Sequence, residues 1–478
     1  MRLPAALSVA LLLFGCGGPA PVDTLAGLTL VAGTTPFGPG CEGAPQSGRN
    51  YPGAQVEPFV AADPADPAHL HLIGVWQQDR FSNGGSKGNA TAASFDGGKS
   101  WTRSLAPFSR CGGGTVSNGG DYDRATDPWV TFSPDGTAYQ CSVSFDDAQG
   151  RAVSAVLVSR SSDGGRSWGA AVAVQRDDNP DVFNDKESIT ADPKDSGAVY
   201  VVWDRLTGQT NADPALGSGP AMLARLLNGS WQKAQILYDP GMDAQTIANQ
   251  IVVMPDGTLV DLFVVITQES SRNPSQRIAV ARSTDKGATW SGPIVVGELL
   301  PVGVEDPRTR TPVRSGAVVP AIAVDPVGGK LYAAWEDARF SNGLRDGIAL
   351  SVSADGGLSW SAPVQVDQDG AAAFTPALAV TRGGKLGLTY YEVEPDFSGD
   401  PGALVVGARL ATSLDGGETF TRVALGGAFS LRRALSGTSY FVGDYQGLAA
   451  GGEEFLPFFV RANSGQSPDA TDVYFKVP

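Results

Sequence analysis

Aromatic residues followed by acidic residues and arginine recur at the ends of several predicted strands. The copies run from Trp76 to Arg80, Trp203 to Arg205, Trp335 to Arg339, and Tyr390 to Glu392. A guanidinium group forms paired hydrogen bonds with a carboxylate, so a cluster of these arginines could hold an anionic ligand. The structural alternative is that each acid caps a turn while its arginine bridges neighbouring sheets. Both explanations stay open for each copy.

A second group of polar residues stands where the predicted innermost strands begin. Its members are Glu57, Arg124, Asp127, Asp185, Lys186, Glu187, Gln250, Arg314, Asp444, Tyr445 and Gln446. If those strands surround one axis, both groups of side chains meet at the same opening. They would supply carboxyl groups for proton transfer and cations for substrate binding.

A short repeated string, Ser-x-Asp-x-Gly-x-x-Trp, indicates how the strands are arranged. Its aspartates are Asp96, Asp163, Asp285, Asp355 and Asp415, and the last copy ends in Phe instead of Trp. A worn copy at Asn228, Gly229 and Trp231 completes a series with a period of about sixty residues, which indicates a radial or stacked repeat. An aspartate that accepts backbone hydrogen bonds beside glycines with positive φ favours a structural hairpin over a catalytic site.

Each period divides into four short alternating segments, so the sequence predicts an all-β fold. First strands begin near Pro58, Pro128, Glu187, Gln250, Pro320, Pro376 and Gln446. Only six fourth strands follow them, and the apolar segment from Leu28 to Val31 can supply the seventh. The prediction is a single domain over residues 28–478, a seven-bladed β-propeller of four-stranded antiparallel blades. An N-terminal strand that joins the C-terminal blade closes it.

The repeated string resembles the Asp-box of sialidases and other BNR-repeat proteins, whose six-bladed propeller is the alternative fold. The resemblance implies an arginine cluster for the sugar carboxylate, a tyrosine nucleophile activated by a glutamate, and an aspartate as acid and base. Tyr445 would be the nucleophile, Glu392 its partner, and Asp127 or Asp185 the proton donor. The residues proposed to bind substrate are Arg80, Arg205, Arg339, Asp79, Lys186 and Asp444. An Arg-Ile-Pro string, typical of sialidases, is absent between Val22 and Pro58.

The predicted function is therefore a sialidase-type exo-glycosidase that acts on acidic glycans at the cell surface. The alternative is a non-catalytic Asp-box propeller that binds a glycan or a protein partner. A formal net charge of -15 disfavours nucleic acid as a partner. No cofactor is expected, the sequence does not indicate whether any acidic turn holds Ca²⁺, and the chain is predicted to be a monomer.

The N-terminus is typical of an exported bacterial lipoprotein. An apolar run from Leu3 to Phe14 is too short to span a bilayer and ends in Leu-Phe-Gly-Cys, where Cys16 would be lipidated. Residues 1–16 would then be the signal segment and residues 17–27 a tether to the outer membrane or cell surface. In an oxidising compartment, Cys41 and Cys111 are the favoured disulfide pair, because Cys141 lies within a predicted strand.

Overall fold

The computed structural model describes residues 25, 27–66, 70–147, 153–208, 217–268, 275–367, 370–394, 404–462 and 471–478. Cys16 and nearly all of the predicted tether lie outside these residues. Within them the chain is all-β, with three short 3₁₀ turns, η1 (Val116–Asn118), η2 (Arg339–Ser341) and η3 (Leu431–Arg433). No helix in the described part of the chain is long and apolar enough to cross a membrane.

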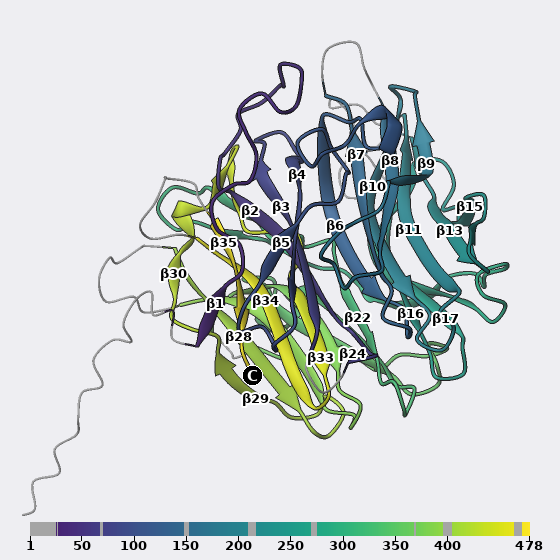
Figure 1. Cartoon of the computed structure of the whole chain (residues 1–478). Coiled ribbons are helices and arrows are strands. Elements are labelled where there is room, and N and C mark those ends of the chain that lie inside the picture. The colour runs from purple at the N-terminus through teal and green to yellow at the C-terminus, as the bar shows by residue number, and fades with distance from the viewer. Residues whose placement is uncertain are drawn as a thin grey trace, which may run out of the picture.

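The first three sets of strands are antiparallel meanders that follow one another along the chain (Figure 1). The first comprises β2 (Gln55–Ala62), β3 (Leu72–Arg80), β4 (Ser86–Ser94) and β5 (Thr102–Ser104). The second comprises β6 (Arg124–Phe132), β7 (Ala138–Phe145), β8 (Ser154–Ser161) and β9 (Val172–Asp177). The third comprises β10 (Val182–Ala191), β11 (Ala198–Thr207) and β13 (Ala221–Leu227), with β14 (Ser230–Trp231) and β15 (Gln235–Tyr238) both paired to β13.

Three further meanders complete the central part of the chain. The fourth set comprises β16 (Ala244–Val253), β17 (Leu259–Thr267), β18 (Ser275–Ser283) and β19 (Ile294–Glu298), and β12 (Ser218–Gly219) links β11 to β16. The fifth comprises β22 (Ala321–Val324), β23 (Leu331–Asp337), β24 (Gly347–Ser353) and β25 (Val364–Gln365). The sixth comprises β26 (Ala373–Val380), β27 (Leu386–Val393), β28 (Val405–Ser413), β29 (Thr421–Ala424) and β30 (Phe429–Ser430).

The last set contains both ends of the described chain. It comprises β33 (Gly447–Gly451), β34 (Glu454–Ala462), β35 (Thr471–Lys476) and, at its outer edge, β1 (Leu28–Leu30). Leu28 lies opposite Lys476 and Leu30 opposite Tyr474, so the N-terminal strand pairs with the last strand as the sequence predicts. This pairing covers an edge of β35 that would otherwise be open.

The first strands of the seven sets stand next to one another in a closed cycle. In chain order β2, β6, β10, β16, β22, β26 and β33 each contact the next, and β33 contacts β2. Buried apolar side chains fill the spaces between neighbouring sheets, and the three largest are Trp76, Trp203 and Trp335. The hydrophobic core is therefore distributed around an axis, and the polar ends of the first strands converge on that axis.

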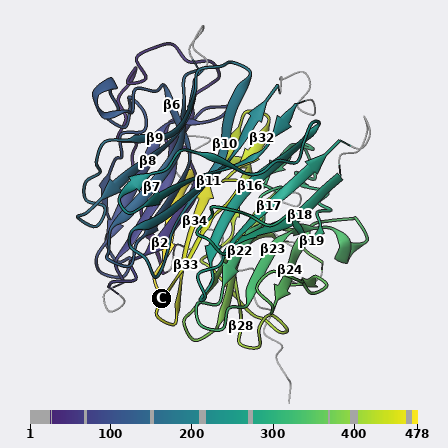
Figure 2. The same cartoon turned by 90° about the vertical axis from the view of Figure 1, so that its right-hand side faces the viewer.

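A small extra sheet, which the sequence did not predict, covers this polar end. It comprises β20 (Val304–Glu305), β21 (Pro312–Arg314), β32 (Ser439–Phe441) and β31 (Leu435–Ser436). We call residues 304–314 and 431–441 the cap. In Figure 2, β32 lies toward the upper end of the molecule and the C-terminus toward the lower end.

Candidate functional site: the channel mouth

The mouth is shaped by a backbone irregularity that several first strands share. Glu57, Asp127, Lys186, Ala248 and Thr375 have φ between 48° and 63°. Each sits at a shift in register between its strand and the second strand, as expected for a β-bulge. Positive φ is costly for residues other than glycine, so these positions depend on their surroundings. Because Ala248 and Thr375 have no ionisable group, the conformation is a feature of the repeat rather than of a reaction.

Lys186 links three of the first strands at the axis. Its Nζ donates to Glu57 Oε1 at 3.1 Å, to Asp127 Oδ1 at 2.8 Å and to Asp444 Oδ2 at 2.7 Å. Glu57 lies on β2, Asp127 on β6 and Lys186 on β10, while Asp444 lies just before β33. We call these four residues the Lys186 cluster. One ammonium group thus satisfies carboxyl groups from three of the seven strand sets.

Two guanidinium groups adjoin this cluster. Arg314 of the cap donates from Nε to Asp444 Oδ1 at 2.8 Å and from its second nitrogen to Asp444 Oδ2. The guanidinium carbons of Arg80 and Arg314 lie 4.3 Å and 4.7 Å from the centroid of the Phe441 ring. Arg80 donates to Gln77 Oε1 at 2.8 Å, while its buried Nε has no hydrogen-bond partner among the described residues. The cap therefore connects the cluster to the molecular surface through Arg314.

The carboxyl groups of the mouth differ in protonation. Burial and the charge of Asp127 raise the pKa of Glu57 to about 8, so Glu57 is largely protonated at neutral pH. Burial opposes ionisation of Asp127 and Asp444, but nearby cations outweigh it and lower the pKa of both. Burial, followed by repulsion from Asp127, raises the pKa of Asp185 to about 6. Adjacent acids with separated pKa values are a pattern found at acid–base sites.

The cluster is almost closed to solvent. The exposed fraction of the side chain is 10% for Lys186, 0% for Glu57, 5% for Asp127 and 4% for Asp444. Tyr445 lies beside it, with its ring centroid 5.6 Å from Lys186 Nζ, and lines an apolar cavity of about 80 Å³. The ammonium group of Lys186 fills the space between the three carboxyl groups.

The predicted nucleophile and its partner do not contact each other. Tyr445 is buried and donates to the carbonyl oxygen of Pro128 at 3.3 Å. Burial and the charge of Glu57 raise the pKa of Tyr445 far above its usual range, which opposes formation of a phenolate. Glu392 on β27 instead accepts from Arg409 Nε at 3.1 Å.

The three predicted substrate arginines have separate local partners. Arg205 on β11 binds both oxygens of Asp177, at 3.1 Å and 2.5 Å. Arg339 in η2 donates to Asp337 Oδ2 at 2.7 Å, and Arg80 donates to Gln77 as described above. They share no hydrogen-bond acceptor among the described residues, and this matches the structural alternative for the aromatic, acid and arginine strings.

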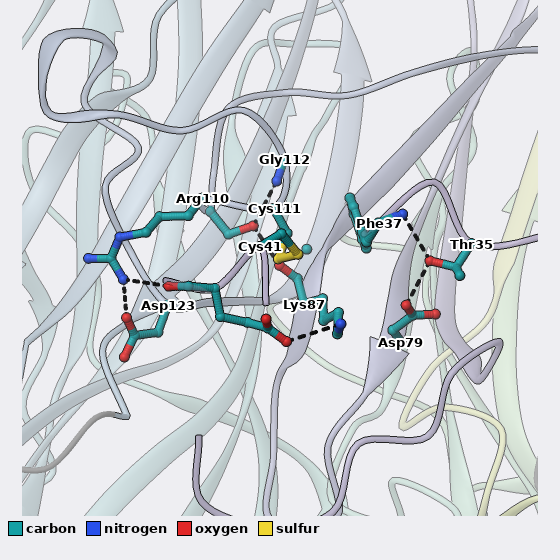
Figure 3. The surroundings of a disulfide bond; sticks show 12 residues. Thr35, Phe37, Cys41, Asp79, Lys87, Arg110, Cys111, Gly112 and Asp123 are labelled. Atoms are coloured by element: carbon teal, nitrogen blue, oxygen red, sulfur yellow. Dashed lines mark hydrogen bonds and ion pairs between the residues drawn. A yellow bond between two sulfur atoms is a disulfide. The ribbon is translucent and has the colours of Figure 1, made fainter. Parts of the chain in front are cut away.

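The predicted ligand-binding Asp79 holds the N-terminal segment instead (Figure 3). It accepts from Thr35 Oγ1 at 2.7 Å and from the Gly53 backbone at 2.9 Å. The same segment is fixed by the disulfide between Cys41 and Cys111, whose Cα atoms are 4.9 Å apart, whereas Cys141 is a free, buried thiol. Residues 31–54, which we call the strap, therefore pass over the rim of the mouth and are held there by the disulfide and by the hydrogen bonds to Asp79.

The Asp-box aspartates lie in turns between third and fourth strands. In each of the five boxes the aspartate accepts from the serine hydroxyl two residues earlier and from a backbone amide four residues later. The aspartates and their serines lie 2.7–2.9 Å apart. The worn copy at Asn228 and Gly229 is a tight hairpin in which both residues have positive φ. Asp96, Asp163, Asp285, Asp355 and Asp415 have no contact with the Lys186 cluster.

The sequence predicted that Glu57, Asp127, Lys186, Arg314 and Asp444 lie at the opening, and the structure brings these residues together. The sequence did not indicate the sheet of the cap or Phe441. The arginines in Glu305 to Arg314, within an acidic chain, are the signal that could have directed attention there.

Comparisons with known proteins give neighbours at the level of structure. No protein-family model matches the chain, and no curated protein matches it. A Hadza microbial sialidase matches with 18% identity and a TM-score of 0.46, over 74% of this chain and 65% of that chain. An α-L-arabinofuranosidase from Fusarium graminearum matches with 12% identity and a TM-score of 0.48, over 81% and 97%. The NanB sialidase from Streptococcus pneumoniae matches with 9% identity and a TM-score of 0.46, over 89% and 93%.

The present chain thus spans less than two thirds of the Hadza microbial sialidase. At this identity, none of the neighbours assigns an activity to the chain.

Proposed function

We propose that the seven strand sets are the blades of one closed seven-bladed propeller over residues 28–478. The closed cycle of first strands and the pairing of β1 with β35 support seven blades over the six-bladed alternative. A closed ring is expected to bury the sheet edges and to expose two unlike ends, one with the mouth and one with the Asp-boxes.

Within that fold we infer a non-catalytic protein that binds acidic glycans at the cap. One observation supports the non-catalytic part: the ammonium group of Lys186 engages Glu57, Asp127 and Asp444 in a nearly closed cluster. Acid–base catalysis needs carboxyl groups within reach of a substrate proton. In this cluster the carboxyl groups instead contact the ammonium group of Lys186.

The cap supplies the charge that favours an acidic ligand. Residues 304–314 and 431–441 contain five arginines, Arg308, Arg310, Arg314, Arg432 and Arg433, and two acids, Glu305 and Asp306, in a chain of net charge -15. The exposed fraction of the side chain is 74% for Arg310 and 47% for Arg314. The ion pair between Arg310 and Glu305 is exposed on both sides, and exposed ion pairs contribute little energy, so the Arg310 guanidinium can exchange the Glu305 carboxylate for a carboxylate of the ligand.

Binding and hydrolysis should be measured on the same protein. We expect immobilised polygalacturonate and sialyllactose to retain the protein at low salt, neutral arabinan not to retain it, and none of the three to be hydrolysed. Arg310→Gln should weaken binding, whereas Lys286→Gln is the matched control because Lys286 is exposed and ion-paired in an Asp-box turn. Equal effects of both variants, or no retention by either acidic glycan, would refute the cap as the binding site.

A glycosidase is the second candidate because Glu57 and Asp127 have opposite protonation at neutral pH. In that case Glu57 would donate a proton to the leaving group and Asp127 would act as base, after Lys186 had moved aside. Turnover of a fluorogenic sialoside or arabinofuranoside that Glu57→Gln abolishes would establish this candidate and overturn the first. Turnover lost with Tyr445→Phe would support the sialidase-type mechanism in particular.

We further propose that the mature chain is a monomer held at the outer membrane or cell surface by lipidated Cys16. Its partner would be a glycan or glycoprotein and not nucleic acid, and the lipid on Cys16 would be what attaches the chain to the membrane. Radioactive or click-labelled palmitate incorporated into wild-type protein but not into Cys16→Ser would support this localisation.

A further inference from the structure

The direction of β1 determines the end of the ring from which the chain enters. Leu28 pairs with Lys476 and Leu30 with Tyr474, so β1 runs opposite to β35. Thr471, at the start of β35, lies at the mouth end, because its hydroxyl donates to the carbonyl oxygen of Gln55 at 2.6 Å. The other end of β35 must then lie away from the mouth, and Leu28 lies there with it.

That other end carries the Asp-box turns. The Phe475 ring packs against Gly98 of the first box, and its centroid is 5.4 Å from that of Trp101. Lys476 Nζ donates to the carbonyl oxygen of Gly27 at 3.2 Å. In Figure 1, β1 and the C-terminus both lie low in the view, and the chain after β1 rises to the opposite end. The first strand is therefore entered from the Asp-box end.

Chain length limits where an anchor on Cys16 can hold the ring. Ten residues lie between Cys16 and Gly27, and a relaxed flexible chain with this number of residues has a root-mean-square length of about 17–20 Å. The strand β2 has eight residues and spans about 26 Å from mouth to Asp-box end. A tether that passed along the outer wall to the mouth would have to extend beyond its relaxed length, to about two thirds of its limit of about 36–40 Å.

We propose that the Asp-box face lies against the lipid bilayer that holds the anchor, and that the mouth and cap face away from it. This inference rests on the proposed lipidation of Cys16. It assigns the Asp-box turns, whose hydrogen bonds are internal, a position next to lipid headgroups. It also leaves the arginines of the cap open to ligands arriving from the surrounding medium.

Exposed apolar side chains on the Asp-box face are consistent with such an orientation. Leu358 and Leu414 lie within two of the Asp-box turns and are 57% and 86% exposed. Val327, in the turn between β22 and β23, is 65% exposed. These turns belong to adjacent sheets, because Gly416 packs beside Lys330. Each of these exposed side chains could enter the interfacial layer, where burial of apolar area from water is favourable.

Site-directed fluorescence on the full lipidated chain tests the orientation. Leu414→Cys on the Asp-box face and Leu344→Cys at the mouth end form a matched pair, since both side chains are more than 80% exposed. Each would be labelled with NBD and reconstituted in phosphatidylcholine vesicles that contain a headgroup-labelled quenching lipid. The native thiols do not compete, since Cys141 is buried and Cys41 is bonded to Cys111. We expect loss of most emission at position 414 and little loss at position 344.

Equal quenching at both positions, or stronger quenching at position 344, would overturn the proposed orientation. Flotation of the vesicles separates this failure from failure of the anchor, because wild-type protein should float with them and Cys16→Ser should not. If the wild-type chain does not float, lipidation is wrong and the orientation is withdrawn with it. If wild-type protein floats but the quenching is reversed, only the orientation is wrong.

Discussion

Replacing Lys186 with methionine removes the ammonium group that three buried carboxyl groups share. Asp444 would keep its paired hydrogen bonds with Arg314, and Glu57 would stay protonated because its pKa is already about 8. Asp127 would lose its cation and keep two neutral side-chain donors, the Thr126 hydroxyl at 3.1 Å and the protonated carboxyl group of Glu57. An ionised carboxylate left unpaired in the interior typically costs about 3–5 kcal/mol. That is a large share of the total stability of about 5–15 kcal/mol expected for a folded domain.

The pH dependence separates this explanation from a simple packing defect. In the wild-type chain the pKa of Asp127 is lowered, so its stabilising contribution is present above its unfolded-state pKa and is lost as pH falls. In Lys186→Met, burial without a cation should raise the pKa of Asp127, so the cost of ionising it grows as pH rises. The difference in free energy of unfolding between the two proteins should thus be smaller near pH 4.5 and larger at pH 7.

Urea unfolding followed by tryptophan fluorescence at both pH values would measure this difference. Lys286→Met is the matched control, because its ion pair with Asp195 is about half exposed and should be worth less than about 1 kcal/mol. Adding Asp127→Asn to Lys186→Met should recover part of the lost stability. A destabilisation by Lys186→Met that is equal at both pH values, or below about 1 kcal/mol, would refute the claim that the cluster is a buried, compensated ion network.

Three further outcomes follow from the structure. Glu57→Gln should flatten the pH dependence of the free energy of unfolding between about pH 5 and 8, because an acid with a raised pKa destabilises the wild-type fold as pH rises through that range. Parallel pH curves for the variant and the wild-type protein would contradict the raised pKa of Glu57. Gly98→Ala should lower the urea midpoint more than Gly257→Ala: both have positive φ, but only at Gly98 would a Cβ overlap a ring, that of Phe475, which adds about 1–3 kcal/mol. Reducing the Cys41–Cys111 bond, which spans 70 residues, should cost up to about 4 kcal/mol in unfolding titrations with and without reductant; no change would show that the strap is held by other contacts.

The repetitive part of the fold could be predicted because each copy of the Asp-box repeats the same local physics. The serine, aspartate and glycines satisfy their own turn, so the boxes at Asp96 and Asp355 form without help from distant residues. The sequence contains one fewer fourth strand than first strands, and this difference indicated that Leu28–Leu30 supplies the missing strand. In the structure β1 pairs with β35, as this prediction required. A periodic pattern therefore predicts elements and their pairing.

The composition of the mouth could not be predicted in the same way. Lys186 and Asp444 are 258 residues apart, and their contact depends on a bulge in β10 and on the approach of the cap. Arg339 was expected at the mouth, yet it donates to Asp337, two residues before it. The sequence shows which charged residues are present, but the fold determines whether an arginine pairs with an acid nearby in the sequence or with a distant one.

The shape of the ring explains why charge gathers on one side of the axis. Equivalent bulge positions carry Glu57, Asp127 and Lys186 on three adjacent first strands, whereas Ala248 and Thr375 occupy such positions elsewhere. Ala248 packs in an apolar cluster with Val319 and Tyr445. A buried carboxylate is tolerated only beside a cation, so the charged positions must be neighbours. The pairing of each buried carboxylate with a cation stabilises this cluster, and the same burial removes its groups from solvent. This burial favours the cap as the site of the proposed ligand binding, because there the Arg314 guanidinium joins the cluster to the surface.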